Sequence, residues 1–427
     1  MSPAIISLII LVVCIILFIT RIIPNAATAC LGCLAFALTG VCSLADAFSG
    51  FSNTTVILMF GMMVVGIAMM DTGAAKLIGK YVAKVSAGNE RMFILIAGTA
   101  SALLSTFLSN TAVIAIFLPI IASVAQSNQN MSRKNLTLPV TMGAMFGGVC
   151  TLVGSTPQLT ANGILTEMTD RELKMFDFTL PGIVIFIVYM LYALTIGYKV
   201  GNKVWGNRDE VAANEKELQA AEELEKLNIN KKRLIIMLAI FVLTIILFIG
   251  DWIPTAVTAV IAALLCIITG CTTQKSVIKN MDWSVVFILA GCLGIASGLT
   301  KSGAGELMAK WLSSVFSADS SPILILALFV LITMLISNFI TNSTAVVITL
   351  PIALSLCSAT GLNPIAYTLA IVYAANLTFS TPLANAQTAM TLVAGYKFSD
   401  YIKYTWILDI LVFAAVVGSV AIFVPLT

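Results

Sequence analysis

Long apolar runs dominate this chain of 427 residues, and short stretches rich in charge, proline or glycine separate them. An apolar run of about 20 residues, wound into a helix, crosses the hydrocarbon core of a bilayer. Such runs predict ten membrane spans, five in each half of the chain: 3–22, 25–45, 53–71, 136–168, 180–198, 234–250, 254–271, 283–300, 365–394 and 405–426. The pattern therefore predicts an all-α polytopic membrane protein.

The two halves match each other when the sequence is offset against itself so that position 17 falls on position 247. At this offset Leu17-Phe18-Ile19 falls on Leu247-Phe248-Ile249, and Gly61 falls on Gly291. A series of matches at a fixed offset is the signature of an internal repeat. Because five crossings is an odd number, the second half must start on the opposite side of the membrane, which predicts inverted repeats. The predicted units are a first repeat at 1–198, a charged cytoplasmic linker at 199–233 and a second repeat at 234–427.

Two polar triplets interrupt apolar runs at matching positions of the repeats, Ser109-Asn110-Thr111 and Thr341-Asn342-Ser343. The first lies in a long charge-free run, 92–125. As one helix this run would reach about 51 Å, well beyond an apolar core of ~30 Å. A re-entrant hairpin with the triplet at its tip explains the length, and its counterpart is predicted at about 322–357. Non-helical backbone at this depth requires protein or a watery cavity around it.

The triplets therefore line either a binding site or a tight protein contact. A helix that starts at each tip directs its free N–H groups and its positive dipole end at the site, which favours an anion. Each repeat also contains a second break, at Gly154-Ser155-Thr156-Pro157 and at Ser380-Thr381-Pro382. Proline frees upstream carbonyl oxygens, which suit a small cation. Such polar residues also serve as hydrogen-bond glue between helices, but their recurrence in both repeats favours a binding site.

Composition supports a membrane protein and excludes most enzyme classes. Hydrophobic residues make up 59% of the chain and charged residues only 10%, which is too little polar surface for a water-soluble globule. The chain has no histidine, which excludes catalytic triads, His-ligated zinc and imidazole proton transfer. Its nine cysteines complete no metal-binding pattern, and its net charge of +3 forms no stripe for nucleic acid. We therefore predict neither an enzyme nor a nucleic-acid-binding protein, and no cofactor.

The basic residues predict an orientation in the membrane. With the N-terminus outside, 19 Lys and Arg residues fall on the cytoplasmic side and 4 on the outside. The positive-inside rule then places both termini outside, in what we expect to be a bacterial inner membrane with lipid around the spans. The five tryptophans, Trp205 among them, lie near predicted span ends, as in an aromatic belt.

These motifs resemble those of the divalent anion/sodium symporter (DASS) family, which carries two Ser-Asn-Thr motifs at hairpin tips. The resemblance extends over nearly the whole chain and includes the paired hairpins, the break at 154–157, the Asp282-Trp283 span start, and amphipathic stretches at 74–87 and 304–317. The family implies an elevator-type homodimer, which takes up di- or tricarboxylates or sulfate, usually with sodium. In that mechanism a transport domain, here 91–198 with 321–427, moves against a fixed scaffold, here 1–90 with 234–320.

The resemblance also implies binding residues, position by position. One sodium site would consist of Ser105, Ser109, Asn110 and Gly154, and the other of Ser337, Thr341, Asn342 and Ala384. The substrate carboxylates would be held by Asn110, Thr111, Thr341, Asn342 and Ser343. The chain departs from the family pattern in its second triplet, which is Thr-Asn-Ser, and at Gln158 and Asn385, where the family often differs. The second triplet keeps both the serine and the threonine hydroxyl, so we expect the binding site to be retained. The departures therefore bear on which anion is bound.

The leading hypothesis is cation-coupled uptake of a small dianion such as succinate, malate or citrate. Neither Lys nor Arg lies at the tips, so dipoles, hydroxyls and a bound cation would hold the anion. Because neither Asp nor Glu lies near the motifs in the sequence, sodium is favoured over protons, and Asp409 is interpreted as structural. Three alternatives stay open: a sodium-independent anion exchanger, a sulfate transporter and, from a different class, an anion channel.

Overall fold

The structure is a computed structural model that describes residues 2–77, 81, 89–128, 131–205, 219, 230–315, 321–382 and 385–427. The regular structure in these ranges is helical, and no strand occurs in them. A helix satisfies its backbone N–H and C=O groups within its own segment, which is what a lipid environment requires. The predicted all-α class is therefore confirmed for the described residues.

The helices of the first half begin at residues suited to helix starts. Ser2 caps the first helix by accepting a hydrogen bond from the Ile5 N–H, and Asn53 accepts from the Thr55 N–H at 2.8 Å. The elements are α1 (Pro3–Thr20), α2 (Asn25–Leu38), α3 (Leu44–Ala47), the 3₁₀ turn η1 (Ser49–Ser52), α4 (Thr54–Asp71), α6 (Glu90–Ser105), α7 (Asn110–Ser127), α8 (Arg133–Gly148), α9 (Thr156–Thr169), α10 (Thr179–Tyr192), the π-helical η2 (Ala193–Gly197) and α11 (Tyr198–Trp205).

The second half repeats this order of elements. It consists of α13 (Lys231–Gly250), α14 (Thr255–Ile268), α15 (Gln274–Asn280), α16 (Trp283–Lys301), α17 (Ala304–Val315), α18 (Pro322–Ser337), α19 (Asn342–Thr360), α20 (Pro364–Asn376), α21 (Ala386–Met390), the 3₁₀ turn η3 (Thr391–Ala394) and α22 (Phe398–Phe423). Helix α17 covers most of the amphipathic stretch predicted at 304–317. Most of the stretch at 74–87, and the core of the charged linker, lie outside the described residues.

Turn geometry recurs between the halves at the offset found in the sequence. Positive backbone φ angles occur in three pairs of residues separated by that offset: Arg21 and Asp251 (52° and 50°), Gly40 and Gly270 (71° and 73°), and Gly73 and Gly303 (76° and 73°). The N-caps of α3 and α15, Ser43 and Thr273, are separated by the same offset. The two halves therefore share local structure as well as sequence.

Within the described residues, eight helical segments are long and apolar enough to cross a membrane: α1, α4, α7, α10 to α11, α13, α16, α19 and α22. Helices α7 and α19, predicted as short hairpin arms, are among them because they have 18 and 19 residues. Helices α2 and α14 have 14 residues each, so they are shorter than the spans predicted at 25–45 and 254–271. Length and composition alone therefore support an integral membrane protein but do not separate arms from spans.

The two predicted spans that contain a break, 136–168 and 365–394, are each divided into two helices in the structure. Residues 149–155 separate α8 from α9, and residues 377–385 separate α20 from α21. We call these segments break 1 and break 2. Pro157 lies in the first turn of α9, where a proline costs no backbone hydrogen bond, so it starts a helix after the break. Pro382 lies inside break 2.

Helices from the two halves pack against each other through glycine. Helix α2 packs against α16, and α4 packs against α14. A Cβ on Gly61 would lie 2.7 Å from the carbonyl carbon of Ala259, and one on Gly291 would lie 2.8 Å from that of Ala29. Small residues allow such close approach where lipid provides little hydrophobic drive for association. These two contacts occupy positions that match at the offset found in the sequence.

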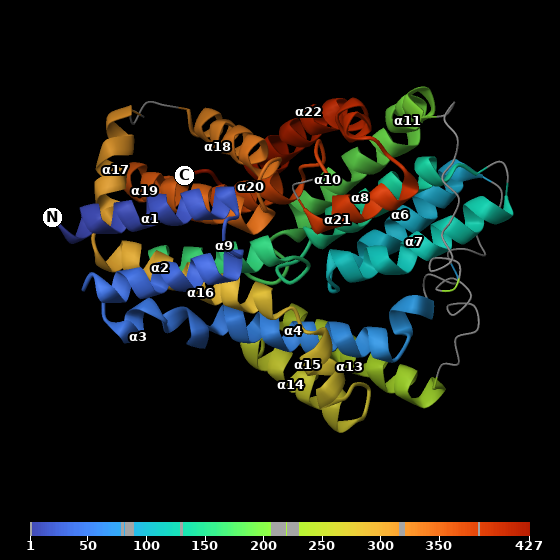
Figure 1. Cartoon of the computed structure of the whole chain (residues 1–427), viewed down its shortest axis with the longest axis horizontal. Helices are drawn as coiled ribbons and strands as arrows, with labels where there is room; N and C mark the ends of the chain where they lie inside the picture. The colour runs from blue at the N-terminus through green and yellow to red at the C-terminus, as the bar shows by residue number, and fades with distance from the viewer. Residues whose placement is uncertain are drawn as a thin grey trace.

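A second group of helices surrounds the two polar triplets. Helices α6 and α7 pack on α8, α18 and α19 pack on α20, and α10 packs on α22. Helix α9 connects the two groups because it contacts α16 as well as α19 and α20 (Figure 1). The hairpins and breaks therefore belong to one packed unit, beside the pairs α2 with α16 and α4 with α14.

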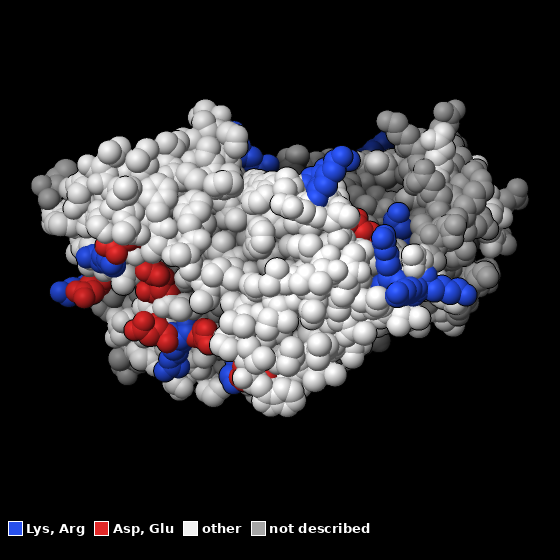
Figure 2. Space-filling model, turned by 90° about the horizontal axis from the view of Figure 1, so that it is seen from below, with Lys and Arg blue, Asp and Glu red and all other residues white. Residues whose placement is uncertain are grey.

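The molecular surface is apolar over large areas, and its charges differ between its two ends. Large apolar side chains such as Leu38 and Ile268 are 78% and 77% exposed, as lipid contact requires. On the face in Figure 2, acidic and basic residues mix toward the end that carries the N-terminus in Figure 1, whereas basic residues predominate at the other end. Trp205 departs from the predicted aromatic belt: it is 2% exposed and donates a hydrogen bond to Asn135 Oδ1 at 2.7 Å.

Candidate functional site

The first triplet forms the turn of a helical hairpin. Helix α6 ends at Ser105 and α7 begins at Asn110, so the polar residues lie between two apolar arms. Ser109 caps α7 by accepting a hydrogen bond from the Ala112 N–H at 3.3 Å. The Ser105 hydroxyl donates to Asn110 Oδ1, and Asn110 is only 5% exposed, whereas Ser109 and Thr111 are exposed. One turn therefore presents a buried amide beside two accessible hydroxyls.

Glycines of α8 and break 1 close around this amide. A Cβ on Gly148, the last residue of α8, would overlap Asn110 Oδ1. A Cβ on Gly154 would in turn overlap the carbonyl oxygen of Gly148. The structure therefore brings together Ser105, Asn110 and Gly154, three of the four residues predicted for the first sodium site, while Ser109 acts as the helix cap beside them.

The carbonyl groups of break 1 are less free than the sequence predicts. The Gln158 amide donates to the Gly148 carbonyl at 2.7 Å and to the Thr151 carbonyl at 3.4 Å. The Thr151 hydroxyl donates to the carbonyl of Thr106 in the hairpin turn. The break is thus tied to the hairpin, and side-chain donors occupy carbonyl oxygens that were expected to be available to a cation.

The second hairpin places its triplet in the same way. Helix α18 ends at Ser337 and α19 begins at Asn342. The Ser337 hydroxyl donates to the Ala375 carbonyl at 2.7 Å and to Asn342 Oδ1 at 3.3 Å. Thr341 pairs its hydroxyl with that of Thr344 at 2.6 Å. Ser337 and Asn342 are therefore in contact, as the prediction requires.

The remaining residues of the second triplet and of break 2 complete this half. Thr341, Asn342 and Ser343 are all half-buried. Ala384, predicted for the second sodium site, lies outside the described residues. The Thr381 hydroxyl of break 2 donates to the carbonyl of Asn338 in the hairpin turn, as Thr151 does to Thr106 in the first half. The tie between hairpin and break therefore recurs in both halves.

Sequence analysis missed a polar bridge that joins the halves. Gln158 Oε1 accepts hydrogen bonds from the Ser155 hydroxyl and, at 3.2 Å, from the Asn376 amide. Asn376 is the last residue of α20 and follows Ala375, whose carbonyl receives the Ser337 hydroxyl. Gln158 bonds Gly148 on its other side. One chain of contacts thus runs from the first hairpin to the second, and only three-dimensional proximity reveals it.

A second contact between the halves involves the tip of the first hairpin. The amide of Gln387 in α21 donates to the Thr111 hydroxyl at 3.3 Å. Thr111 is one of the predicted substrate residues, and Gln387 was not. Gln387 lies three residues after the predicted Ala384, which was the available signal in the sequence.

The structure also corrects the expectation that acidic residues lie far from the motifs. Asp409 of α22 accepts a hydrogen bond from the hydroxyl of Ser380, a residue of break 2. The two residues are 29 positions apart in the chain, so the sequence alone does not place them together. A carboxyl group is therefore present at the edge of this polar region.

Electrostatically, the site combines two helix starts with amide and hydroxyl groups. Asn110 and Asn342 stand at the first positions of α7 and α19, where unpaired backbone N–H groups carry partial positive charge. Neither triplet contains a charged side chain. This arrangement can hold an anion through N–H and O–H donors, and amide oxygens beside it can coordinate a hard cation.

A family model described as "CitMHS: Citrate transporter" matches this chain in two overlapping segments, residues 15–343 and 317–426. This chain belongs to the CitMHS citrate transporter family. The assignment makes it a membrane transport protein and not an enzyme. The two hairpins and two breaks described above lie within the residues that match the family.

Individual relatives of this CitMHS member are also transporters. It is 33% identical to the uncharacterized transporter YfbS of Escherichia coli over 44% of this chain and 31% of that protein. It is 25% identical to the sodium-dependent dicarboxylate transporter SdcS of Staphylococcus aureus over 88% and 78% of the two chains. The crystal structure of the YdaH transporter of Alcanivorax borkumensis superposes with a TM-score of 0.63 over 92% and 88% of the chains, at 14% identity, which supports the fold alone.

Proposed function

We propose that this protein is a secondary active transporter that couples sodium to the movement of a small di- or tricarboxylate such as succinate, malate or citrate. The observation that carries the proposal is the paired arrangement of Ser105 with Asn110 and Ser337 with Asn342 at two helix starts. The family match and the sodium-dependent dicarboxylate transporter among the relatives support the same substrate class and the same ion.

The binding roles follow from chemistry at the two tips. Substrate carboxylates would accept hydrogen bonds from Asn110, Thr111, Thr341, Asn342 and Ser343, whose donors and helix dipoles replace the missing basic side chains. Sodium, as a cargo ion, would be bound by oxygens of Ser105, Ser109, Asn110 and Gly154 in one half, and of Ser337, Thr341, Asn342 and Ala384 in the other. A cation beside each tip would offset the charge of a dianion.

The transport cycle we propose is an elevator motion within a homodimer. Residues 91–198 and 321–427 would move as one domain against a scaffold of 1–90 and 234–320, and the two halves would be inverted repeats joined by 199–233. The recurring φ angles and the packed unit around the hairpins support this division. The mixed charge at the N-terminal end and the basic charge at the other end support an inner-membrane orientation with both termini outside (Figure 2).

Uptake into liposomes with a defined sodium gradient tests the proposal. We expect an inward sodium gradient to accelerate uptake of succinate or citrate, and we expect Asn110→Ala and Asn342→Ala to abolish it while expression and dimer formation stay unchanged. Uptake that ignores sodium, or counterflow that requires internal substrate, would instead identify an exchanger. Preferred uptake of sulfate would change the substrate class, and single-channel currents far above transporter turnover would identify a channel.

Ligand binding gives a second test that does not depend on flux. A ligand that binds the folded state raises its apparent stability. We therefore expect dicarboxylates to raise the unfolding temperature of the purified protein more in sodium than in potassium. Equal shifts in the two salts would contradict coupling at the level of binding.

A further inference from the structure

Asp409 is a carboxyl group inside a membrane helix. It is residue 12 of the 26 in α22, and among the eight candidate spans of the described residues it is the acidic residue furthest from a helix end. An ionisable group at such a depth is costly and usually has a functional role. The transport proposal above assigns it none.

Among the described residues, one of the two carboxyl oxygens of Asp409 has no hydrogen-bond partner. Oδ2 accepts hydrogen bonds from the Ser380 hydroxyl and, at 3.4 Å, from the Thr405 hydroxyl. Oδ1 is buried and has no hydrogen-bond partner. Burying a charged oxygen without a donor is expensive, whereas the same oxygen carrying a proton is neutral.

In the part of the chain that the structure describes, the helices packed on α22 supply no basic partner for this carboxyl group. Among the helices packed on α22, Tyr192 of α10 interacts electrostatically with Asp409, but its hydroxyl donates a hydrogen bond to the Tyr404 carbonyl. Four other tyrosines of these elements bond elsewhere: Tyr367 bonds the Pro322 carbonyl, Tyr373 the Phe178 carbonyl, Tyr198 the Glu90 carboxylate and Tyr189 the Pro139 carbonyl. The hydrogen bonds of Asp409 come from Ser380 and Thr405, and not from the remaining titratable groups, which are Lys199, Lys203, Asp400, Tyr401, Lys403 and Tyr404. Helix α18 and η2 contain no titratable residue.

The spacing of the oxygens favours a proton over a metal ion. Two oxygens that share a hard cation at about 2.4 Å stand about 3.4 Å apart when they meet it at a right angle. Here the Ser380 and Thr405 hydroxyl oxygens are 2.9 Å apart, and Ser380 is in close hydrogen-bond contact with Oδ2. These separations suit shared hydrogens and leave no space for an ion between the oxygens.

We propose that Asp409 is a proton-binding site, protonated in the conformation described here, whose occupancy is linked through Ser380 to the conformation of break 2. When break 2, which holds Ser380 against the carboxyl group, rearranges and admits water, the carboxyl O–H bond breaks, the proton passes to water, and a hydrated carboxylate remains. The protein thus has a pH-responsive group in spite of its lack of histidine. This inference goes beyond the transported ions and holds for whichever anion is carried.

Infrared difference spectroscopy of the reconstituted protein tests this site without any transport measurement. At about pH 7 exposed Asp and Glu are ionised, so a carbonyl stretch typical of a protonated carboxylic acid reports a protected one. We expect this band in the wild type, its loss in Asp409→Asn, and its retention in Asp71→Asn. Asp71 is a matched control because its carboxylate accepts a threonine hydroxyl, from Thr272 at 2.6 Å, at the end of α4.

Ser380→Ala tests the link to break 2 and also serves if Asp409→Asn does not fold. Removing the Ser380 donor should shift the frequency of the band, because the hydrogen bond to the carboxyl group is lost. Identical bands in the wild type and Asp409→Asn would overturn the proton site, and a band that Ser380→Ala leaves unmoved would overturn the link. If the wild type shows the carboxylic acid band but no sodium-driven uptake, the proposed transport function is contradicted and the proton site is not.

Discussion

The two hairpins share a plan but close around their asparagines by different means. In the first half, Gly148 provides space for Asn110, and the Gln158 amide holds the carbonyl of Gly148. The matching position in the second half is Thr378, whose hydroxyl lies 3.4 Å from that of Ser337. The first site is therefore shaped by the absence of a side chain and the second by an added hydroxyl.

This difference extends to the helices after the breaks. Ser155 and Asn385 are equivalent caps, and each contacts the residue three positions on, Gln158 or Thr388. Gln158 reaches across to Asn376 in the other half, whereas Thr388 stays with Asn385. The two halves thus have similar sites, and different residues at matching positions give these sites unequal packing. We expect the first site to tolerate change less than the second.

Substitution at the paired positions Gly148 and Thr378 should have the largest effect. In Gly148→Ala the new methyl group would displace the Asn110 amide, so we expect transport to fall by at least about tenfold, which corresponds to roughly 1.4 kcal/mol. Thr378→Ala removes a hydroxyl that makes two long contacts, at 3.4 Å to the Ser337 hydroxyl and at 3.4 Å to the Ala375 carbonyl, and should cost only about 0.5–1.5 kcal/mol in stability. The comparison is made by measuring uptake by both variants at the same amount of folded protein. Equal losses would contradict the unequal packing of the two sites.

Substitution of the two glycines at the contacts between the halves, Gly61 and Gly291, should destabilise the protein to a similar degree. Gly61→Ala and Gly291→Ala each place a methyl group against an alanine backbone of the other half, and overpacking of this kind costs about 1–3 kcal/mol. Gly66→Ala is the matched control on α4, because the nearest atom to its Cβ would be 3.7 Å away. Thermal unfolding in detergent measures the effect. A stable Gly61→Ala beside an unstable Gly291→Ala would show that the two contacts are not equivalent.

Sequence patterns anticipate most of the helices and both hairpin turns because these depend on local chemistry. Apolar length predicts spans, and the polar triplets predict helix starts because Ser and Thr cap helices well. Helices α7 and α19 end at Ser127 and Thr360, slightly beyond the predicted hairpin ends at about 125 and 357, because an apolar run has no internal marker of where an arm ends. The shortness of α2 and α14 was hidden for the same reason.

The parts of the site that the sequence does not reveal depend on contacts distant along the chain. The bridge from Gln158 to Asn376 joins residues 218 positions apart, and the contact of Gln387 with Thr111 joins residues 276 apart. Asp409 looks isolated in the sequence, yet it lies against Ser380 because α22 folds back onto break 2. Trp205 has the position of a belt residue but fills a buried space beside Tyr404. Packing decides each of these cases.

Removing the Gln158 bridge should have an intermediate effect and show whether the halves are energetically coupled. Gln158→Met keeps the size of the side chain but leaves the buried Asn376 amide and Gly148 carbonyl with fewer partners, at a cost of about 1–3 kcal/mol. A double-mutant cycle with Asn376→Leu, followed by thermal unfolding, isolates the pairwise energy. Strict additivity of the two substitutions would show that the bridge does not couple the halves.

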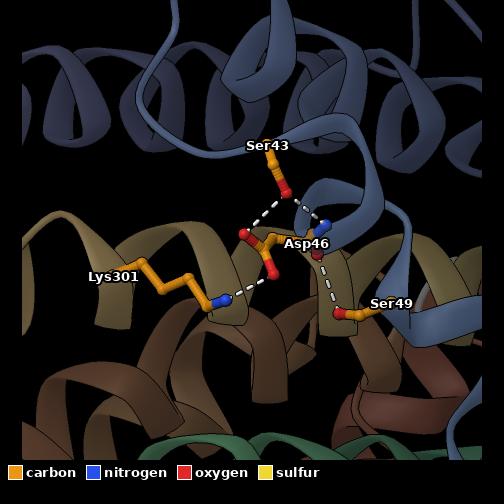
Figure 3. A network of polar contacts seen from close by, with 4 residues as sticks. All are labelled: Ser43, Asp46, Ser49 and Lys301. Carbon is orange, nitrogen blue, oxygen red and sulfur yellow. Dashed lines mark hydrogen bonds and ion pairs between the residues drawn. The ribbon is translucent and has the colours of Figure 1, made fainter.

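The smallest effect on stability is expected at the ends of α16 and α4. These two helix ends occupy matching positions in the two halves but differ in charge. Lys301 ends α16 and pairs with Asp46 of α3, which also accepts the Ser43 hydroxyl at 2.7 Å (Figure 3). At the equivalent end of α4, Asp71 accepts a neutral hydroxyl, from Thr272. The Lys301 hydrogen bond and then that of Ser43 hold the pKa of the Asp46 carboxyl below its ordinary value of 3.8.

A depressed pKa in the folded state means that the Asp46 contacts stabilise the fold above the ordinary value and lose this contribution as the pH falls through the lowered one. We therefore expect the wild type to lose a little unfolding temperature below about pH 4 that Asp46→Asn does not lose, with Asp71→Asn behaving like the wild type. The side chains of Asp46 and Lys301 both reach solvent, so added salt should screen the pair and narrow the difference. If the unfolding temperature falls equally with acid in Asp46→Asn and the wild type, the Asp46–Lys301 pair stabilises the fold no more than the neutral contact of Asp71 with Thr272.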